Sequence, residues 1–346
     1  MPLFIIYRYG QTNCFVGPAL KYAVYAVNDQ EAYLCTYRSI RNMAFQGITS
    51  VRGEISQLVE VPGSVLIGTK VKAPYSIYPE VYVLPMANVL ATKGTGVVTS
   101  VPSDSPDDFQ AVTDLRKKAE YYKIDPAWVS YDPIPVISTP TYGDMIAPAV
   151  VKQLKIASQK DTKQLAEAKE IAYKEGHFNG TMLVGKYKGE SVQIAKGKTR
   201  ADMIADGLAF AYAEPEGLIT SRSADECVVA LMDQWYLDYG EPVWRAQVEK
   251  CVSSLSLSLC GFSSSFRHLA SMELYIPETR HAFEKTLAWL NKWACARTYG
   301  LGSDLPWDPH FMVESLSDST IYMAYYTIAQ LLHGEIRFPS LSIARC

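Results

Sequence analysis

The chain has 346 residues, of which 48% are hydrophobic and 20% are charged, and its formal net charge is −3 at pH 7. This composition supports a packed core of one or two domains and excludes a largely disordered chain. The small negative charge excludes a globally basic protein, so any nucleic acid would be bound through a local patch.

The seven cysteines are scattered and form no C-x-x-C pair, which argues against a zinc site and indicates a reducing compartment. No apolar run reaches the ~18 residues of a membrane span. Met1 leads into no signal sequence. We therefore expect a cytoplasmic protein that has no metal site and no membrane association.

Short segments rich in Val, Tyr and Ile, separated by Gly, Pro and Asn-Asp, predict strands in the first hundred residues. Helical spacing of apolar residues then predicts two helices, with a proline-rich loop over 126–149 between them. A further group of strands is expected over 181–195. The predicted strands are 22–28, 32–37, 64–71 and 80–86, and the predicted helices are 109–123 and 151–175.

The character of the sequence changes after the EPEG stretch at 214–217, which we expect to be exposed. Residues 226–237 begin as a continuous apolar run, which is typical of a parallel strand buried on both faces. Helical patterns follow at 242–251, 277–293 and 315–332. This half is typical of part of a parallel α/β sheet.

We therefore predict an α/β chain with a domain boundary near residue 216, which divides it into 1–216 and 217–334. The second part contains an anomalous Ser/Leu/Phe-rich insert at 255–271, which has the look of translated non-coding sequence. The tail, 335–346, has no pattern and is expected to be unstructured.

Residues 94–108, GTGVVTSVPSDSPDD, pass from a glycine-framed apolar run to a cluster of carboxylates. Ser105 can serve as the N-cap of a helix, with Pro106 at its first position and Asp108 at its third, close to a capping box. Alternatively, a carboxylate at this strand–turn–helix junction pairs with an ammonium group. The local sequence leaves both interpretations open.

Longer motifs carry a resemblance to a family. Together with GQTN (10–13), RNMAFQG (41–47) and YVLPM (82–86), the stretch at 94–108 resembles the editing domain of eukaryotic cytosolic leucyl-tRNA synthetases. Three motifs of the second half resemble the catalytic domain of the same family, and residues 272–293 resemble its plant members. Those motifs are SRSADECVVALMDQWYLDYGE (221–241), WACARTYGLGSDLPWD (293–308) and ESLSDSTIYMAYYTIAQLLHG (314–334).

The resemblance implies a β-rich editing domain, of the inserted connective-peptide type, followed by a partial class I synthetase Rossmann-like catalytic domain. It implies leucine–tRNA ligase function, with the hydrolytic editing part mainly retained here. Such editing is needed because a methylene or a methyl shift changes binding by only ~1–3 kcal/mol. The implied partners are the acceptor end of tRNA(Leu), leucine and near-cognate amino acids, and other synthetases.

The resemblance also implies roles for individual residues. Asp108 falls where the family has its editing aspartate, which holds the α-ammonium of the misattached amino acid; as an ordinary ionised Asp it would bind rather than act as a base. Gly94, Thr95 and Gly96 would let the backbone approach the adenosine closely, although the same glycines also fit a bulged strand. In the synthetic half, the leucine-side residues would be Ser319, Tyr322 and Tyr326, and the alternative is an aromatic helix face packed in a core.

Two departures from the family pattern accompany these matches. Relatives carry a threonine-rich T-x-R-P-x-T stretch before GQTN, where this chain reads PLFIIYRY, and Arg8 is not a demonstrated substitute. The H-x-G-H-type and K-M-S-K-S signatures are also absent, so ATP and Mg, the cofactors of the full-length family, are not expected to act in this chain. The alternative function is therefore a catalytically inactive truncated synthetase that binds tRNA or a partner.

Overall fold

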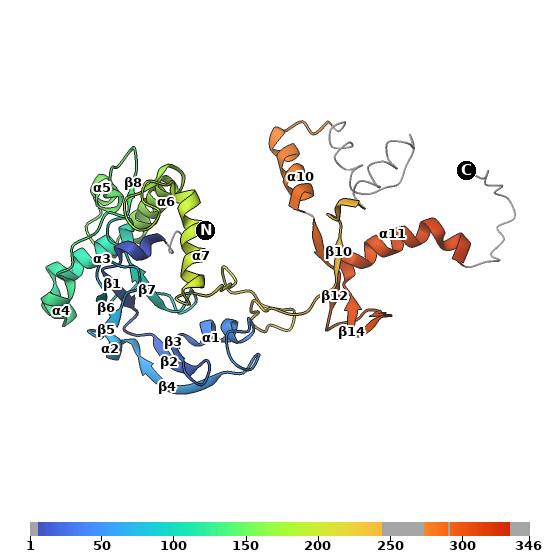
Figure 1. Cartoon of the computed structure of the whole chain (residues 1–346), viewed down its shortest axis with the longest axis horizontal. Coiled ribbons are helices and arrows are strands. Elements are labelled where there is room, and N and C mark those ends of the chain that lie inside the picture. The colour runs from blue at the N-terminus through green and yellow to red at the C-terminus, as the bar shows by residue number, and fades with distance from the viewer. Residues whose placement is uncertain (1–5, 244–272, 290, 333–346) are drawn as a thin grey trace. The chain divides into compact units, whose positions relative to one another are not determined.

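The computed structural model describes residues 6–243, 273–289 and 291–332. The chain divides into two compact units between Leu231 and Met232, shown in Figure 1. Most of the predicted helix at 242–251, the insert at 255–271 and the tail at 335–346 lie outside the described residues. The proposed boundary near residue 216 stays a prediction, and residues 217–231 make their contacts within the first unit.

The first unit contains a four-stranded sheet, a three-stranded sheet and one two-stranded pair. The larger has the strand order β5-β6-β1-β7, with β1 parallel to β6 and antiparallel to β7. The smaller is antiparallel, in the order β3-β2-β4. The strands are β1 Asn13–Val16, β2 Lys21–Ala26, β3 Ala32–Cys35, β4 Ser56–Pro62, β5 Lys70–Lys72, β6 Glu80–Pro85 and β7 Val97–Ser100.

Alternation along the strands decides what each sheet face contacts. Val16 and Val83 of the larger sheet share an apolar cluster with Tyr22 of the smaller sheet, so the two sheets pack on each other. Phe15, which points to the opposite face of β1, packs with Leu115 of the helix α3 (Pro106–Lys117). The buried face of the helix α1 (Tyr37–Ala44) covers the smaller sheet.

Most of the remaining elements of the first unit are helices (Figure 1). The short strands β8 and β9 pair with each other and pack beside α7 and Tyr9. The remaining elements are η1 Ile6–Gly10, α2 Gly63–Leu66, α4 Ala119–Tyr122, η2 Pro126–Val129, β8 Ile137–Ser138, α5 Ile146–Gln153, α6 Thr162–Asn179, β9 Thr181–Met182 and α7 Val192–Ala205.

The predicted strands at 22–28, 32–37 and 80–86 are confirmed as β2, β3 and β6. Three other predictions need correction. The expected strand at 64–71 begins as α2, and the expected strands at 181–195 give way to α7. The single helix at 151–175 is two helices, α5 and α6, because Asp161 Oδ2 accepts the N–H groups of Ala157 and Ser158 and so stabilises a turn between them.

The second unit contains two antiparallel sheets among its described residues. The predicted helix at 315–332 is confirmed. The expected buried strand at 226–237 is wrong: residues 227–235 lie in no strand and are half-buried or exposed. The elements are β10 Tyr236–Asp238, α10 Pro277–Trp289, β11 Lys292–Ala294, β12 Ala296–Arg297, β13 Asp304–Leu305, β14 Asp308–Val313 and α11 Ser315–Leu332.

Candidate functional site

The start of α3 agrees with the sequence prediction in outline and differs in its bonding. Ser105 is the N-cap and Pro106 the first helical residue, but the Ser105 side chain makes no capping bond, so the capping box is wrong. Instead, Asp108 Oδ2 accepts the main-chain N–H of Val101 at 2.8 Å. The carboxylate therefore joins the first turn of α3 to the residue that follows β7.

The Asp108 carboxyl is buried, with 6% of the residue exposed. Burial raises its pKa to about 7, although the bonds from Val101 and Ser105 act in the opposite direction. The expectation of an ordinary ionised aspartate was therefore wrong, because a group with this pKa is only partly ionised at neutral pH. A bound ammonium group would favour the carboxylate form, which is the behaviour expected of a cation-binding residue.

Sequence reasoning missed a second buried carboxyl, that of Asp104. The residue has no exposed surface, and its Oδ2 accepts the Ser103 hydroxyl at 2.6 Å. The other oxygen, Oδ1, has no hydrogen-bond partner among the described residues. Burial raises the pKa of Asp104 to about 7. Nothing in the spacing of SDSPDD distinguishes this aspartate from its neighbours, so no sequence signal could have found it.

The helix α6 contributes a cation and a phenol beside the first turn of α3. Lys169 forms an ion pair with Asp107, and the Tyr173 hydroxyl donates to Ser105 Oγ at 3.4 Å. Burial, followed by the nearby Asp108 carboxylate, raises the pKa of Tyr173. The surroundings of Asp108 therefore combine carboxylates, one lysine and a partly buried pair of hydroxyl groups.

The expected adenosine-facing residues form a turn, here called the GTG turn (residues 94–96). Gly94 and Gly96 both have positive φ, +57° and +77°. A Cβ added at Gly94 would meet nothing within 4 Å, whereas one at Gly96 would lie 2.5 Å from Thr36 Cγ2. Gly94 therefore faces open space, and Gly96 is required by close packing.

The strand β7 separates the GTG turn from Asp108. Gly96 directly precedes β7, and the Val101 N–H that binds Asp108 directly follows it. At ~3.3 Å per residue the two features lie roughly 16 Å apart along the strand. The structure thus places Asp104, Asp107 and Asp108 near Tyr173, and leaves the GTG turn at the other end of β7.

The expected leucine-side residues lie on α11 in the second unit. Ser319 is half-buried, while Tyr322 is 41% exposed and Tyr326 is 67% exposed. The alternative interpretation of an aromatic face packed in a core is therefore wrong. The two tyrosine rings lie 5.7 Å apart between centroids.

The residues before GQTN bear on the missing threonine-rich stretch. Residues 1–5 lie outside the described residues. Arg8 is half-buried, and burial lowers its pKa even though the Cys14 thiol lies nearby. Gln11 Nε2 donates to Cys14 Sγ at 3.0 Å, so the GQTN motif contacts the thiol that lies near Arg8.

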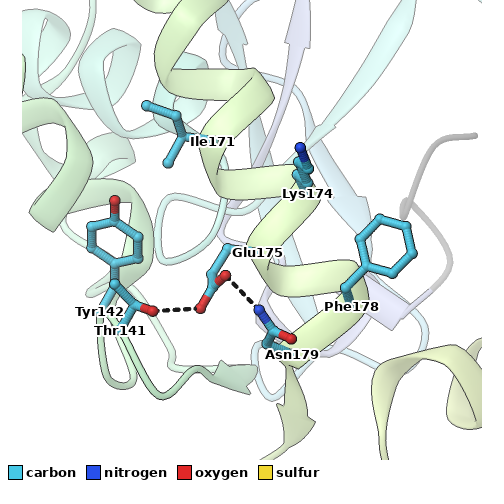
Figure 2. A pocket seen from close by; sticks show the side chains of 7 residues that line it. All are labelled: Thr141, Tyr142, Ile171, Lys174, Glu175, Phe178 and Asn179. Atoms are coloured by element: carbon cyan, nitrogen blue, oxygen red, sulfur yellow. Dashed lines mark hydrogen bonds between the residues drawn. The ribbon is translucent and has the colours of Figure 1, made fainter.

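Figure 2 shows a surface pocket of about 390 Å³ between α6 and the loop before α5. Its one carboxylate, Glu175, accepts Thr141 Oγ1 and Asn179 Nδ2, each at 2.7 Å. None of the residues expected to bind substrate lines it. The lining residues are Thr141, Tyr142, Ile171, Lys174, Glu175, Phe178 and Asn179.

Within the described residues, no three His, Cys, Asp or Glu side chains are grouped so that they could hold a metal ion. No helix in the same part of the chain combines the length and the apolar character needed to cross a membrane.

No protein-family model matches the chain. It is 55% identical over 328 residues to a cytoplasmic leucine–tRNA ligase of Neurospora crassa, which covers 95% of this chain and 28% of the relative. It is 46% identical over 341 residues to that of Arabidopsis thaliana, over 97% of this chain and 30% of the relative. Over the whole chain, the identity to this plant relative is lower than the identity to the fungal one.

The chain thus spans less than a third of the length of these relatives. Among solved structures, it is similar to one described as GlLeuRS-CP1, with 34% identity, a TM-score of 0.56 and coverage of 62% of this chain and 83% of that one. A P. falciparum cytosolic leucyl-tRNA synthetase editing domain matches at 27% identity and a TM-score of 0.57, over 62% of this chain and 78% of that one. On sequence and fold together, the chain belongs to the cytosolic leucyl-tRNA synthetase family and includes that family's connective-peptide editing domain.

Proposed function

We propose that this chain hydrolyses misacylated tRNA(Leu), and that Asp108 holds the α-ammonium group of the misattached amino acid. The observation that supports it is a buried carboxylate at the end of β7, in a unit with an editing-domain fold. A buried anion with few cationic neighbours binds a cation more strongly than an exposed one does.

In this reaction water attacks the ester carbonyl carbon that joins the amino acid to the terminal ribose. The new C–O bond forms as the ester C–O bond breaks, and a proton passes to the departing ribose oxygen. Asp108 fixes the amino-acid end by its charge, so it acts on orientation and binding. The GTG turn would receive the adenosine, and its open side at Gly94 supports that role.

The proposed substrates are acceptor ends of tRNA(Leu) that carry near-cognate amino acids such as norvaline, and the proposed location is the cytoplasm. Leucine and other synthetases are further proposed partners, and Ser319, Tyr322 and Tyr326 are proposed leucine-side residues. The aminoacyl-tRNA synthetase family uses ATP and Mg. The given sequence contains neither ATP signature, so no role in this chain is proposed for those cofactors.

The test is deacylation of norvalyl-tRNA(Leu) by the full chain, beside Asp108→Asn and a matched control, Asp107→Asn. Asp108→Asn keeps an oxygen that can accept the Val101 N–H, so we expect a folded protein that has lost at least tenfold in kcat/KM. The control removes the neighbouring carboxylate, which is paired with Lys169, and should change the rate by less than threefold.

A folded wild-type chain without deacylation would overturn the proposal. It would favour the alternative, an inactive synthetase fragment that binds tRNA or a partner. Equal rates for Asp108→Asn and the wild type would remove Asp108 from the site while leaving hydrolysis in place.

A further inference from the structure

The GTG turn is held in place through its main chain. Gly96 O accepts the Tyr22 hydroxyl at 2.7 Å, and Thr95 O accepts the Thr36 N–H at 3.0 Å. Gly94 O accepts the Ser39 hydroxyl. All of these donors belong to β2, to α1 or to the residue that precedes α1, so the turn is tied to the smaller sheet and its helix.

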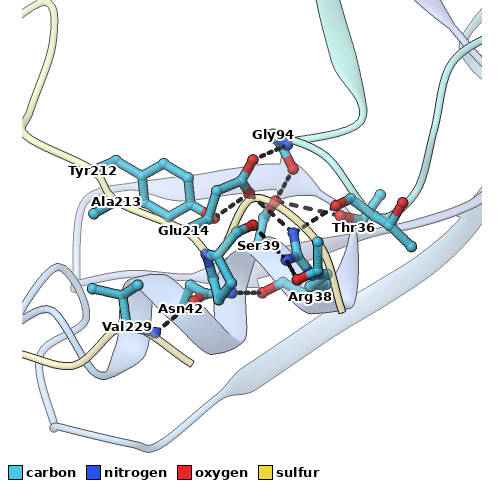
Figure 3. A network of polar contacts seen from close by, with 12 residues as sticks. Thr36, Arg38, Ser39, Asn42, Gly94, Tyr212, Ala213, Glu214 and Val229 are labelled. Carbon is cyan, nitrogen blue, oxygen red and sulfur yellow. Dashed lines mark hydrogen bonds and ion pairs between the residues drawn. The ribbon is translucent and has the colours of Figure 1, made fainter. Parts of the chain in front are cut away.

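One further main-chain hydrogen bond of the turn is made with a residue outside β2 and α1. The Gly94 N–H donates to Glu214 Oε1 at 2.8 Å, as Figure 3 shows. Glu214 belongs to residues 212–217, here called the exit segment, which lie in no helix or strand and lead toward the end of the first unit. The turn and the exit segment are 120 residues apart in the sequence.

The Glu214 carboxylate is itself fixed, and the expectation that EPEG is exposed does not hold for its first residue. Its side chain is 19% exposed, and Oε2 accepts Arg38 Nη1 at 3.2 Å and the Tyr212 hydroxyl at 3.1 Å. Arg38, whose side chain is 12% exposed, also donates to Thr92 O at 2.6 Å and to Pro215 O at 3.1 Å. Arg38 and Glu214 therefore connect both sides of the contact between the turn and the exit segment (Figure 3).

These contacts give the Gly94 peptide a defined orientation. Its C=O is bound by α1 and its N–H by the exit segment. A glycine at φ +57° with open space beside it has no side chain to restrain it, so these two bonds restrain its backbone. Loss of the Glu214 bond would leave one N–H free at the position where the adenosine is proposed to bind.

We propose that Glu214 is a positioning residue for editing: it holds the GTG turn in the form that receives the terminal adenosine and makes that form depend on the docked exit segment. This proposal rests on the proposed function. Binding of the adenosine is shared by the ground state and the transition state, so a loosened turn raises KM and leaves kcat nearly unchanged. The exit segment thereby acts on the site without touching the substrate.

The experiment uses the full chain with Glu214→Ala, Glu214→Gln and the control Glu226→Ala. Glu226 lies outside the exit segment, 3.2 Å from Arg38, and also pairs with Arg41. Its loss therefore removes an ion pair of Arg38 while the bond from Gly94 to Glu214 remains. For norvalyl-tRNA(Leu), we expect Glu214→Ala to raise KM about tenfold with kcat within twofold of the wild type. Glu214→Gln keeps an acceptor for the Gly94 N–H, so its KM should lie close to that of the wild type. The KM and kcat of Glu226→Ala should equal those of the wild type.

Amide hydrogen exchange over residues 92–97 gives a second readout that does not need activity. We expect faster exchange of the Gly94 amide in Glu214→Ala than in Glu226→Ala. Equal exchange in the two variants would overturn the positioning role, and so would a fall in kcat with KM unchanged. If the Gly94 amide exchanges faster in Glu214→Ala than in Glu226→Ala but the wild type does not hydrolyse the ester, the proposed function fails while the Glu214–Gly94 contact is upheld.

Discussion

The carboxylate of Asp108 and the main-chain N–H of Val101 are joined by a hydrogen bond of 2.8 Å, which links the first turn of α3 to the end of β7. The bond makes one side chain serve both the fold and the proposed site. Variants at Asp108 therefore have to separate stability from activity.

Replacing Asp108 by Ala should lower the free energy of unfolding by about 1–3 kcal/mol, because the buried Val101 N–H loses its acceptor. Asp108→Asn retains an acceptor and should cost less. Urea denaturation of the two variants measures the difference. Equal losses would show that the Val101 bond is not what Asp108 contributes to stability.

The buried carboxyls at 104 and 108 predict a pH dependence of stability. Burial raises the pKa of each to about 7, so the folded state holds protons that the unfolded state has released between about pH 4 and 7. The contribution of these two groups to stability should therefore be largest at about pH 4 and below, and it should fall as the pH rises to about 7 and then level off. The fall is up to about 4 kcal/mol for each group.

Asp104→Asn tests this pH dependence directly. The amide cannot ionise, so the fall in unfolding free energy between pH 4.5 and pH 8 should be smaller than in the wild type. Urea denaturation at several pH values measures it. Parallel curves for the two proteins would show that Asp104 does not titrate in this window.

Two glycines of the GTG turn should respond differently to alanine. Gly94→Ala adds a methyl group in open space and should cost about 1–2 kcal/mol of stability from its positive φ alone. Gly96→Ala adds the same strain and a clash with Thr36, for a total of about 2–5 kcal/mol. Thermal unfolding ranks the two.

The variant Gly94→Ala also tests the proposed adenosine contact. If the open side of Gly94 receives the substrate, Gly94→Ala should raise KM for norvalyl-tRNA(Leu) despite its small cost in stability. An unchanged KM would place the adenosine elsewhere.

Residues 217–231 should contribute to the stability of the first unit. Glu226 pairs with Arg38 and Arg41, Val229 is bonded to Asn42 and Gln46, and the Leu231 N–H donates to Phe45 O at 2.9 Å. A chain that ends at residue 216 should therefore unfold several degrees below one that ends at 231. Equal melting temperatures would show that the folded domain ends near residue 216, as the sequence predicts.

Several elements were predictable because their pattern is local. β2 and β6 are rich in Val and Tyr, β3 contains Tyr and Leu, and α11 has a long helical pattern. The start of α3 was also correct, since Ser105 and Pro106 are strong local signals. The interruption between α5 and α6 was missed because a side-chain turn at Asp161 overrides a continuous helical pattern.

The sequence by itself determined the family, through long motifs in a fixed order, and the presence of a carboxylate cluster before α3. Only the tertiary structure decided which oxygen atoms are buried and what they bind, because desolvation depends on residues brought in from other elements. It raised the pKa of Asp104 and Asp108 and turned the Asp108 carboxylate toward Val101. It also brought Glu214 to Gly94 across 120 residues, a contact that no local pattern encodes.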